Sequence, residues 1–122
     1  MTMDYQKILN GLYQDFNQRN IEAVLAHVHT NVTWPNGWEG GYVYGHDQVR
    51  EYWLRQWQEI DPNVVPVSFQ VRPGGLIAVG VHQIIRDLNG QVLSDGLVTH
   101  TYSFKDKKVR SMVIEENEEN IH

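Results

Sequence analysis

Three stretches in the first half of the chain carry apolar residues at three- and four-residue steps, the spacing of one face of an α-helix. They cover residues 4 to about 19, 20 to about 27, and 46 to 60. Asn20 can cap the second helix, and Pro62 follows the end of the third. The apolar positions are Tyr5, Ile8, Leu9, Leu12, Tyr13 and Phe16, then Ile21, Val24, Leu25 and Val28, then Val49, Tyr52, Trp53, Trp57 and Ile60. Each helix therefore has one face to bury.

Beyond residue 63 the pattern changes to β-branched or alternating runs, which are typical of strands. These runs cover residues 64–72, 76–88, 91–104 and 108–115, and a short strand at 32–34 precedes them. Asn89-Gly90 predicts a hairpin turn, because both residues tolerate positive φ. Three helices followed by a strand meander predict an α+β fold: a cone-shaped, curved antiparallel sheet with the three N-terminal helices packed on its concave face. The mouth of such a cone can hold a ligand.

Composition excludes several classes of protein. Without cysteine the chain has no thiol chemistry, disulfide or Cys-based zinc site. A net charge of −5 argues against general nucleic-acid binding, which needs a basic face. No segment approaches the roughly 20 apolar residues of a membrane span, and the N-terminus lacks the order of a signal peptide, so we expect a cytoplasmic protein. We expect a single domain over residues 1–114 and a flexible acidic tail over 115–122.

Aromatic residues concentrate between Trp34 and Trp57, which favours a flat, hydrophobic ligand. Trp53 and Trp57 are four residues apart, the spacing of a packing stripe, whereas Trp34 and Trp38 belong to a turn-rich loop at the expected mouth. Glu39 lies in that loop. If the tryptophans exclude water from it, its pKa rises toward a range useful for proton transfer; the alternative is an exposed acid without a role.

Signatures of metal or cofactor binding are weak in this sequence. His27 and His29 are two residues apart where a helix ends, so their side chains point apart, and no nearby acid completes a set of ligands. There is no phosphate-binding loop, nucleophile elbow or dinucleotide fingerprint. We therefore expect neither a metal nor a cofactor.

A set of short segments carries a family resemblance. They are Asp15-Phe16-Asn17-Gln18-Arg19-Asn20-Ile21, Val32-Thr33-Trp34-Pro35-Asn36-Gly37, Gly45-His46-Asp47 and Arg110-Ser111-Met112. In this order and spacing, over nearly the whole chain, they resemble the SnoaL-like branch of the nuclear transport factor 2-like superfamily, which includes ketosteroid isomerase and polyketide cyclases. The resemblance implies a cone-shaped pocket and a homodimer formed through the outer face of the sheet. Val79, Val81, Gln83 and Ile85 would then face outward as an apolar patch.

The resemblance carries over the isomerase machinery only in part. The position of the family's general-base aspartate falls on Trp34 or Asn36, and neither can take a proton from carbon. The family's oxyanion tyrosine aligns with Leu12, and Tyr13 is about 100° away around the helix. The second oxyanion acid falls on His100. Isomerisation by the family's known residues is therefore disfavoured.

Two mid-strand histidines, His82 and His100, are the remaining candidates for acid–base chemistry. The resemblance places both on the concave face, together with Arg86. Simple hairpin pairing across Asn89-Gly90 instead places residue 82 opposite 97, and the two histidines on opposite faces. A bulge near Asp95 would bring them together; without it, Asp95 faces His82 and could orient its imidazole.

The sequence therefore predicts a small-molecule-pocket protein of the SnoaL-like type. One hypothesis is a cofactor-free isomerase, dehydratase or cyclase that acts by general acid–base chemistry on an apolar or aromatic substrate. The alternative is a non-catalytic ligand-binding or dimeric accessory module with structural histidines. The candidate catalytic residues are His82, His100, Glu39 and Asp95, and the expected pocket lining is Trp34, Trp38, Trp53, Tyr102, Arg86, Leu12 and Phe16.

Overall fold

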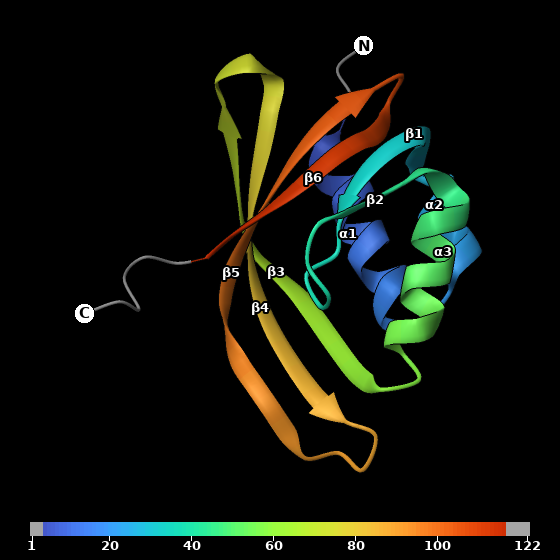
Figure 1. Cartoon of the computed structure of the whole chain (residues 1–122). Coiled ribbons are helices and arrows are strands. Elements are labelled where there is room, and N and C mark those ends of the chain that lie inside the picture. Colours follow the sequence, from blue (N-terminus) through green and yellow to red (C-terminus); the bar gives the residue numbers. More distant parts are fainter. Residues whose placement is uncertain (1–3, 117–122) are drawn as a thin grey trace.

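The computed structural model describes residues 4–116, which form three helices against one curved, unclosed sheet (Figure 1). The helices are α1 (Tyr5–Asn17), α2 (Ile21–Ala26) and α3 (Gly45–Gln56). The strands are β1 (Val28–Pro35), β2 (Tyr42–Tyr44), β3 (Ile60–Arg72), β4 (Leu76–Asp87), β5 (Val92–Lys105) and β6 (Lys108–Glu116), with a short 3₁₀ turn at Pro73–Gly75 between β3 and β4. Their order in the sheet is β2-β1-β6-β5-β4-β3.

The α+β cone with helices on its concave side is confirmed. The sheet is mixed, because β1 runs parallel to β6 while the other neighbouring strands are antiparallel. The third helix ends at Gln56 rather than at residue 60, and Ile60 and Pro62 lie instead in β3. Proline is tolerated there because β3 is an edge strand.

α1 and α2 form where the sequence supplies both a cap and an apolar face, whereas α3 has an apolar face but no side-chain cap. The Asp4 carboxylate accepts a hydrogen bond from the backbone N–H of Lys7, and the Asn20 side chain accepts one from Ala23. Their buried side chains pack against the inner face of the sheet. The core comprises Leu9, Leu12, Tyr13, Val24, Leu25, Val28, Val32, Trp34, Val49, Tyr52, Trp53, Val64, Ile77, Val79, Val81, Tyr102, Val109 and Met112.

The pairing of β4 with β5 decides which side chains enter the cone. Next to the turn Arg86 pairs with Val92, one residue out of the simple hairpin register. Ile85 pairs with Ser94, so Leu93 is an extra residue on β5 that restores this register. Beyond this bulge His82 lies opposite Leu97, as hairpin pairing across Asn89-Gly90 predicts. The bulge is therefore nearer the turn than was expected, and it does not bring the two histidines onto one face.

This register corrects the predicted faces of β4. Val79 and Val81 are fully buried in the core, and Gln83 and Ile85 line the inner side of the cone. None of the four belongs to an outer apolar patch. Their even-numbered neighbours, including His82, face outward because successive side chains of a strand alternate.

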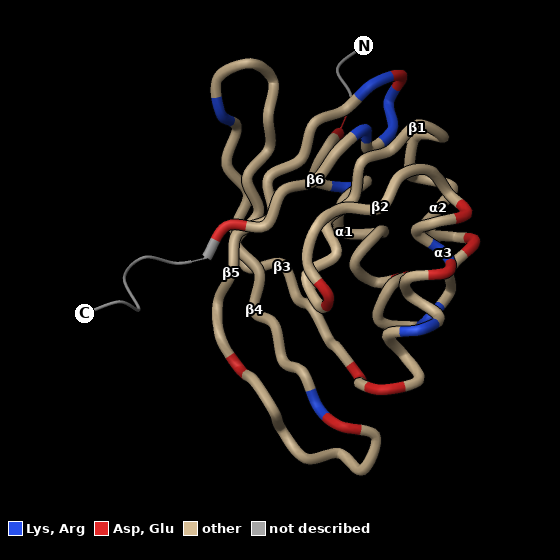
Figure 2. Tube along the Cα trace, in the orientation of Figure 1, with Lys and Arg blue, Asp and Glu red and all other residues tan. Residues whose placement is uncertain are grey.

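Charged residues gather at turns, strand ends and the outer sides of the helices (Figure 2). β6 continues to Glu116, and Glu115 forms an ion pair with Arg72 at 3.2 Å, so the ordered fold extends past the predicted boundary at residue 114. The rest of the predicted tail, residues 117–122, lies outside the described residues. Within residues 4–116 no helix is long and apolar enough to cross a membrane.

Candidate functional site

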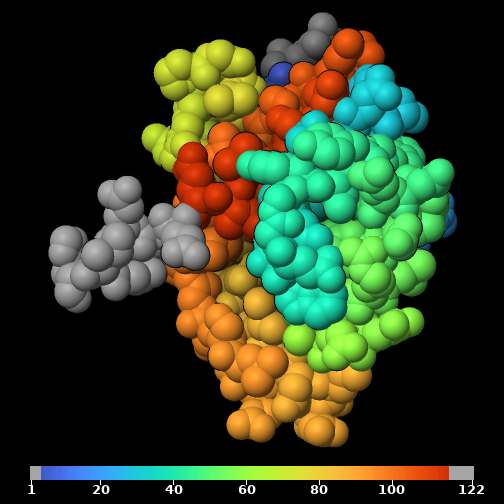
Figure 3. All heavy atoms as spheres, viewed as in Figure 1, coloured from blue at the N-terminus to red at the C-terminus, as the bar shows by residue number. Residues whose placement is uncertain are grey.

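A cavity of about 490 Å³ lies between the concave face of the sheet, α1, α3 and the loop of residues 36–41. In Figure 3 this loop covers the middle of the visible face, between α3 and the strands. The lining residues are Leu12, Tyr13, Phe16, Trp34, Pro35, Gly37, Trp38, Gly41, Tyr42, Tyr52, Trp53, Gln56, Ile60, Pro62, Val64, Gln83, Ile85, Val98, His100, Tyr102, Met112 and Ile114. None of these described residues is Asp, Glu, Lys or Arg. The cavity is therefore a largely aromatic site with a few neutral polar groups.

Three of these polar groups form a hydrogen-bonded chain deep in the cavity. The hydroxyl of Tyr102 donates to the hydroxyl oxygen of Tyr13 at 2.7 Å. The same Tyr13 hydroxyl lies 2.8 Å from Nδ1 of His100. All three residues are at most 5% exposed, so the chain is shielded from bulk water. It joins α1 to the inner face of β5.

The direction of this chain favours one tautomer of His100. Since Tyr13 accepts from Tyr102, its own proton is left for Nδ1 of His100, which then acts as an acceptor. A neutral imidazole with an unprotonated Nδ1 carries its proton on Nε2. Nε2 is buried and has no hydrogen-bond partner among the described residues. His100 therefore has an N–H donor that the fold leaves unused, on a buried residue that lines the cavity.

Burial keeps these groups uncharged at neutral pH. It lowers the pKa of His100 to about 4, and it raises the pKa of Tyr13 and of Tyr102 above the usual value for a phenol. Burial also raises the pKa of Tyr52 to about 12. A histidine with so low a pKa is a weak proton acceptor but remains a good hydrogen-bond donor. The site is therefore suited to binding a hydrogen-bond acceptor, more than to removing a proton.

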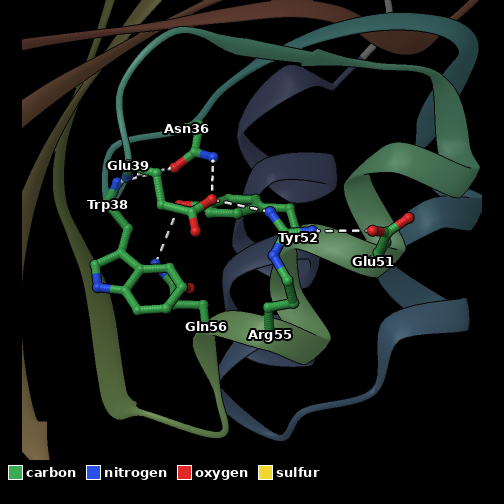
Figure 4. Close-up of polar contacts among 7 residues, drawn as sticks. All are labelled: Asn36, Trp38, Glu39, Glu51, Tyr52, Arg55 and Gln56. Atoms are coloured by element: carbon green, nitrogen blue, oxygen red, sulfur yellow. Dashed lines mark hydrogen bonds and ion pairs between the residues drawn. The ribbon is translucent and has the colours of Figure 1, made fainter.

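The loop of residues 36–41 is held against α3 by side chains of both (Figure 4). Asn36 accepts hydrogen bonds from the backbone N–H groups of Trp38 and Glu39, at 3.2 and 2.7 Å. The hydroxyl of Tyr52 lies close to the backbone of Gly37 and Trp38. Arg55 on α3 donates to the Glu39 carboxylate at 2.9 Å. These contacts place Trp38 over the mouth of the cavity.

Glu39 does not have the environment of a proton shuttle. Its side chain is 46% exposed and does not line the cavity. A hydrogen bond from Asn36 and another from Arg55 lower its pKa, so of the two alternatives the structure shows the exposed acid and not the carboxyl secluded from water. The reason is that the loop turns this carboxylate toward α3 and solvent rather than between Trp34 and Trp38.

His82 and Asp95 form a pair of their own, on the outer face of the sheet. His82 Nε2 lies 2.6 Å from a carboxylate oxygen of Asp95, and both side chains are about half exposed. The expectation that His82 and Arg86 face the concave side is wrong, because neither lines the cavity. Of the four candidate catalytic residues, the structure places only His100 in the cavity wall.

The predicted wall is otherwise present: Leu12, Phe16, Trp34, Trp38, Trp53 and Tyr102 all line the cavity. Trp53 also contacts Trp34 and Phe16 edge to face, with ring centroids 5.5 and 5.4 Å apart. It therefore serves both the core and the wall. Aromatic contacts of this kind hold the wall rigid.

Sequence reasoning missed Tyr13 and Tyr52. Tyr13 is about 100° around the helix from Leu12, but a buried helix stripe can be more than 100° wide, and both residues line the cavity. The width of the apolar stripe on this helix was the feature of the sequence that could have identified Tyr13. Tyr52 lies four residues before Gln56, which donates to its hydroxyl at 3.1 Å, and this spacing is visible in the sequence.

Clusters suited to a metal ion are not found among residues 4–116, where no three His, Asp or Glu side chains come together. His27 and His29 lie 3.6 Å from Asp15 and Asp106, respectively, in two separate pairs. Neither pair lines the cavity.

Comparison with known proteins shows that residues 9–112 match the family model of the SnoaL-like domain. Among solved structures, TerC co-crystallized with polyporic acid has a TM-score of 0.78 and 22% identity, over 95% of this chain and 93% of that one. An NTF2-like protein of unknown function from Burkholderia pseudomallei has a TM-score of 0.79 and 20% identity, over 95% and 92%. RV0760c from Mycobacterium tuberculosis, in complex with estradiol-17β-hemisuccinate, has a TM-score of 0.79 and 13% identity, over 97% of each chain. The search of curated proteins finds no significant match.

Proposed function

Because the chain belongs to the SnoaL-like domain family, we propose that its cone binds a flat apolar or aromatic small molecule and that His100 donates a hydrogen bond from Nε2 to an oxygen acceptor of this ligand. One observation carries the proposal: His100 lines an aromatic cavity, and its buried Nε2 has no hydrogen-bond partner among the described residues. Leaving a buried donor unpaired costs about 1–3 kcal/mol, and a ligand acceptor would recover much of it.

The cavity and the structural neighbours support this class of ligand. A volume of about 490 Å³ lies within the range of small-molecule sites, and aromatic walls with few polar groups are typical of them. TerC was co-crystallized with polyporic acid and RV0760c with estradiol-17β-hemisuccinate, both small organic molecules. These two structures are similar to the chain in fold alone. The proposed class of ligand is therefore argued from the lining of the cavity.

A second candidate function is catalysis without a cofactor, as an isomerase or lyase. The observation that favours it is the Tyr102–Tyr13–His100 chain, since hydrogen bonds in a chain polarise one another. The neutral imidazole of His100 would polarise a bound carbonyl in the way an oxyanion hole does. No carboxylate among the described residues lines the cavity, so a proton acceptor would have to come from the substrate or from water.

The binding proposal is tested with two probes of nearly the same shape, 4-acetylbiphenyl and 4-isopropylbiphenyl. We expect the native protein to bind the ketone about 2- to 10-fold more tightly, the yield of one net hydrogen bond, and to lower the infrared carbonyl frequency of the bound ketone. His100→Phe should abolish both effects. His82→Gln is the matched control and should retain both, because His82 lies on the outer face. Equal binding of the two probes by the native protein would overturn the proposal.

We also propose that the outer face of the sheet forms a homodimer. The apolar residues on this face are not the four expected from the sequence. They include Val65 and Val113, whose side chains face outward and which are 46% and 42% exposed. Exposed apolar groups on a sheet face favour association. Sedimentation at micromolar concentration should show a dimer that Val65→Glu weakens, and a monomeric native protein would contradict the proposal.

A further inference from the structure

A second polar group of the cavity, the amide of Gln83, is not used by the fold. Gln83 lies on the inner face of β4 and lines the cavity. Among the described residues its side chain forms no hydrogen bond, while its backbone pairs with Gly96 in the sheet. An amide supplies both a donor and an acceptor, so it can bind a hydroxyl or a carbonyl of a ligand.

The sheet register sets the distance between Gln83 and His100. His100 on β5 pairs with Val79 on β4, and Gln83 is four residues further along β4. At about 3.3 Å per residue, the two positions are about 13 Å apart along the strand direction. The inner-face residues between them, Val81 and Val98, are apolar. The cavity floor thus presents a polar group, an apolar stretch and a second polar group.

The polar groups at the two positions also differ in depth. His100 is 5% exposed at the buried end, whereas Gln83 is only partly buried and shares its part of the wall with Ile60, Pro62 and Ile85. A ligand that reaches both must therefore enter with one end deep in the cone and the other nearer solvent. The absence of Asp, Glu, Lys and Arg from the described lining favours uncharged ends.

We propose that Gln83 is a specificity-determining residue and that the ligand is an elongated, flat molecule with an uncharged oxygen group at each end. His100 binds the inner oxygen, and Gln83 binds the outer one. This inference rests on the proposed function, since the inner contact is the His100 donor described above. It adds that the two oxygens must be separated by about two aromatic rings.

The test adds one hydroxyl to the probe used above. The native protein should bind 4-acetyl-4′-hydroxybiphenyl about 2- to 10-fold more tightly than 4-acetylbiphenyl. Gln83→Leu should remove this gain while it preserves the preference for 4-acetylbiphenyl over 4-isopropylbiphenyl. His82→Gln, which changes the adjacent outward residue, should keep the gain. The shorter 4-hydroxyacetophenone should bind equally well to the native protein and to Gln83→Leu, because its two oxygens are one ring closer together.

The outcomes separate this inference from the proposed function. A hydroxyl that adds no affinity, or a gain that survives in Gln83→Leu, overturns the role of Gln83 even if the ketone is still preferred over the hydrocarbon. Loss of that ketone preference in the native protein overturns the proposed function instead. Circular dichroism of Gln83→Leu should match that of the native protein, so that a lost gain reports binding rather than unfolding.

Discussion

Replacing Tyr13 by Phe removes one oxygen atom from the centre of the buried polar chain. Tyr102 then loses the acceptor of its 2.7 Å hydrogen bond, and Nδ1 of His100 loses its partner at 2.8 Å. A buried polar group left unpaired costs about 1–3 kcal/mol. With two such groups, and some return from no longer burying the Tyr13 hydroxyl, we expect Tyr13→Phe to lower the free energy of unfolding by about 2–4 kcal/mol.

Tyr102→Phe is the control that tests this reasoning. It removes only the terminal donor, because Tyr13 keeps its own hydrogen bond to His100. Its cost should be about 1 kcal/mol. The double variant has no Tyr102 hydroxyl, so this group cannot be left unpaired. The loss of unfolding free energy in the double variant should therefore be smaller than the sum of the losses in the two single variants. The expected coupling is about 1 kcal/mol or more.

Urea denaturation at pH 7, followed by tryptophan fluorescence, measures all three variants on one scale. Neutral pH is suitable because the histidine and both tyrosines are uncharged there. The reasoning is refuted if Tyr13→Phe costs less than about 0.5 kcal/mol, or if the single costs simply add. Either result would mean that the chain is not a sealed, mutually dependent network.

Three further predictions concern His100, the loop and the α1–β3 contact. The pKa of His100 is about 4 in the folded protein and about 6.5 in the unfolded chain. The stability that comes from burying the neutral imidazole is therefore present above pH 6.5 and is lost as the pH falls toward 4. From pH 7 to 4.5 the native protein should therefore lose about 2–3 kcal/mol more of unfolding free energy than His100→Phe, and equal losses in urea titrations would contradict this. Glu39→Gln should leave the affinity for 4-acetylbiphenyl within about twofold by calorimetry, since Glu39 does not line the cavity; a tenfold loss would show a role in binding. Asn17 donates to the carbonyl of Val64 at 2.7 Å and accepts from its N–H at 3.0 Å, so Asn17→Ala should cost about 1–3 kcal/mol in urea denaturation, and an unchanged midpoint would contradict that.

The contrast between His82 and His100 shows how far sequence reasoning reaches in a sheet. Both histidines are recognisable from the sequence as mid-strand residues that need partners. Hairpin pairing across Asn89-Gly90 predicted the observed alignment of residue 82 with 97, whereas the family resemblance predicted the opposite face. Because side chains alternate, one extra residue such as Leu93 decides the matter, and its position at the turn was not visible in the sequence.

Glu39 and Tyr13 show a second limit, because the role of a titratable group depends on its neighbours in space. Glu39 directly follows Trp38 in the sequence, yet its partners are Asn36 and Arg55, the latter sixteen residues away. Tyr13 is hydrogen-bonded to His100, which is 87 residues away in the sequence. Such pairings follow from how the loop and α1 pack, and packing is a property of the whole chain.

By itself the sequence determined most of the elements, the α+β class and the aromatic wall, because helix periodicity, strand alternation and turn residues are local signals. The tertiary structure alone decided that His100, and not His82, enters the cone, that its Nε2 is left without a partner among the described residues, and that Glu39 faces solvent. These features depend on register, burial and long-range hydrogen bonds. A local pattern does not encode them, because each arises only when distant strands and helices meet.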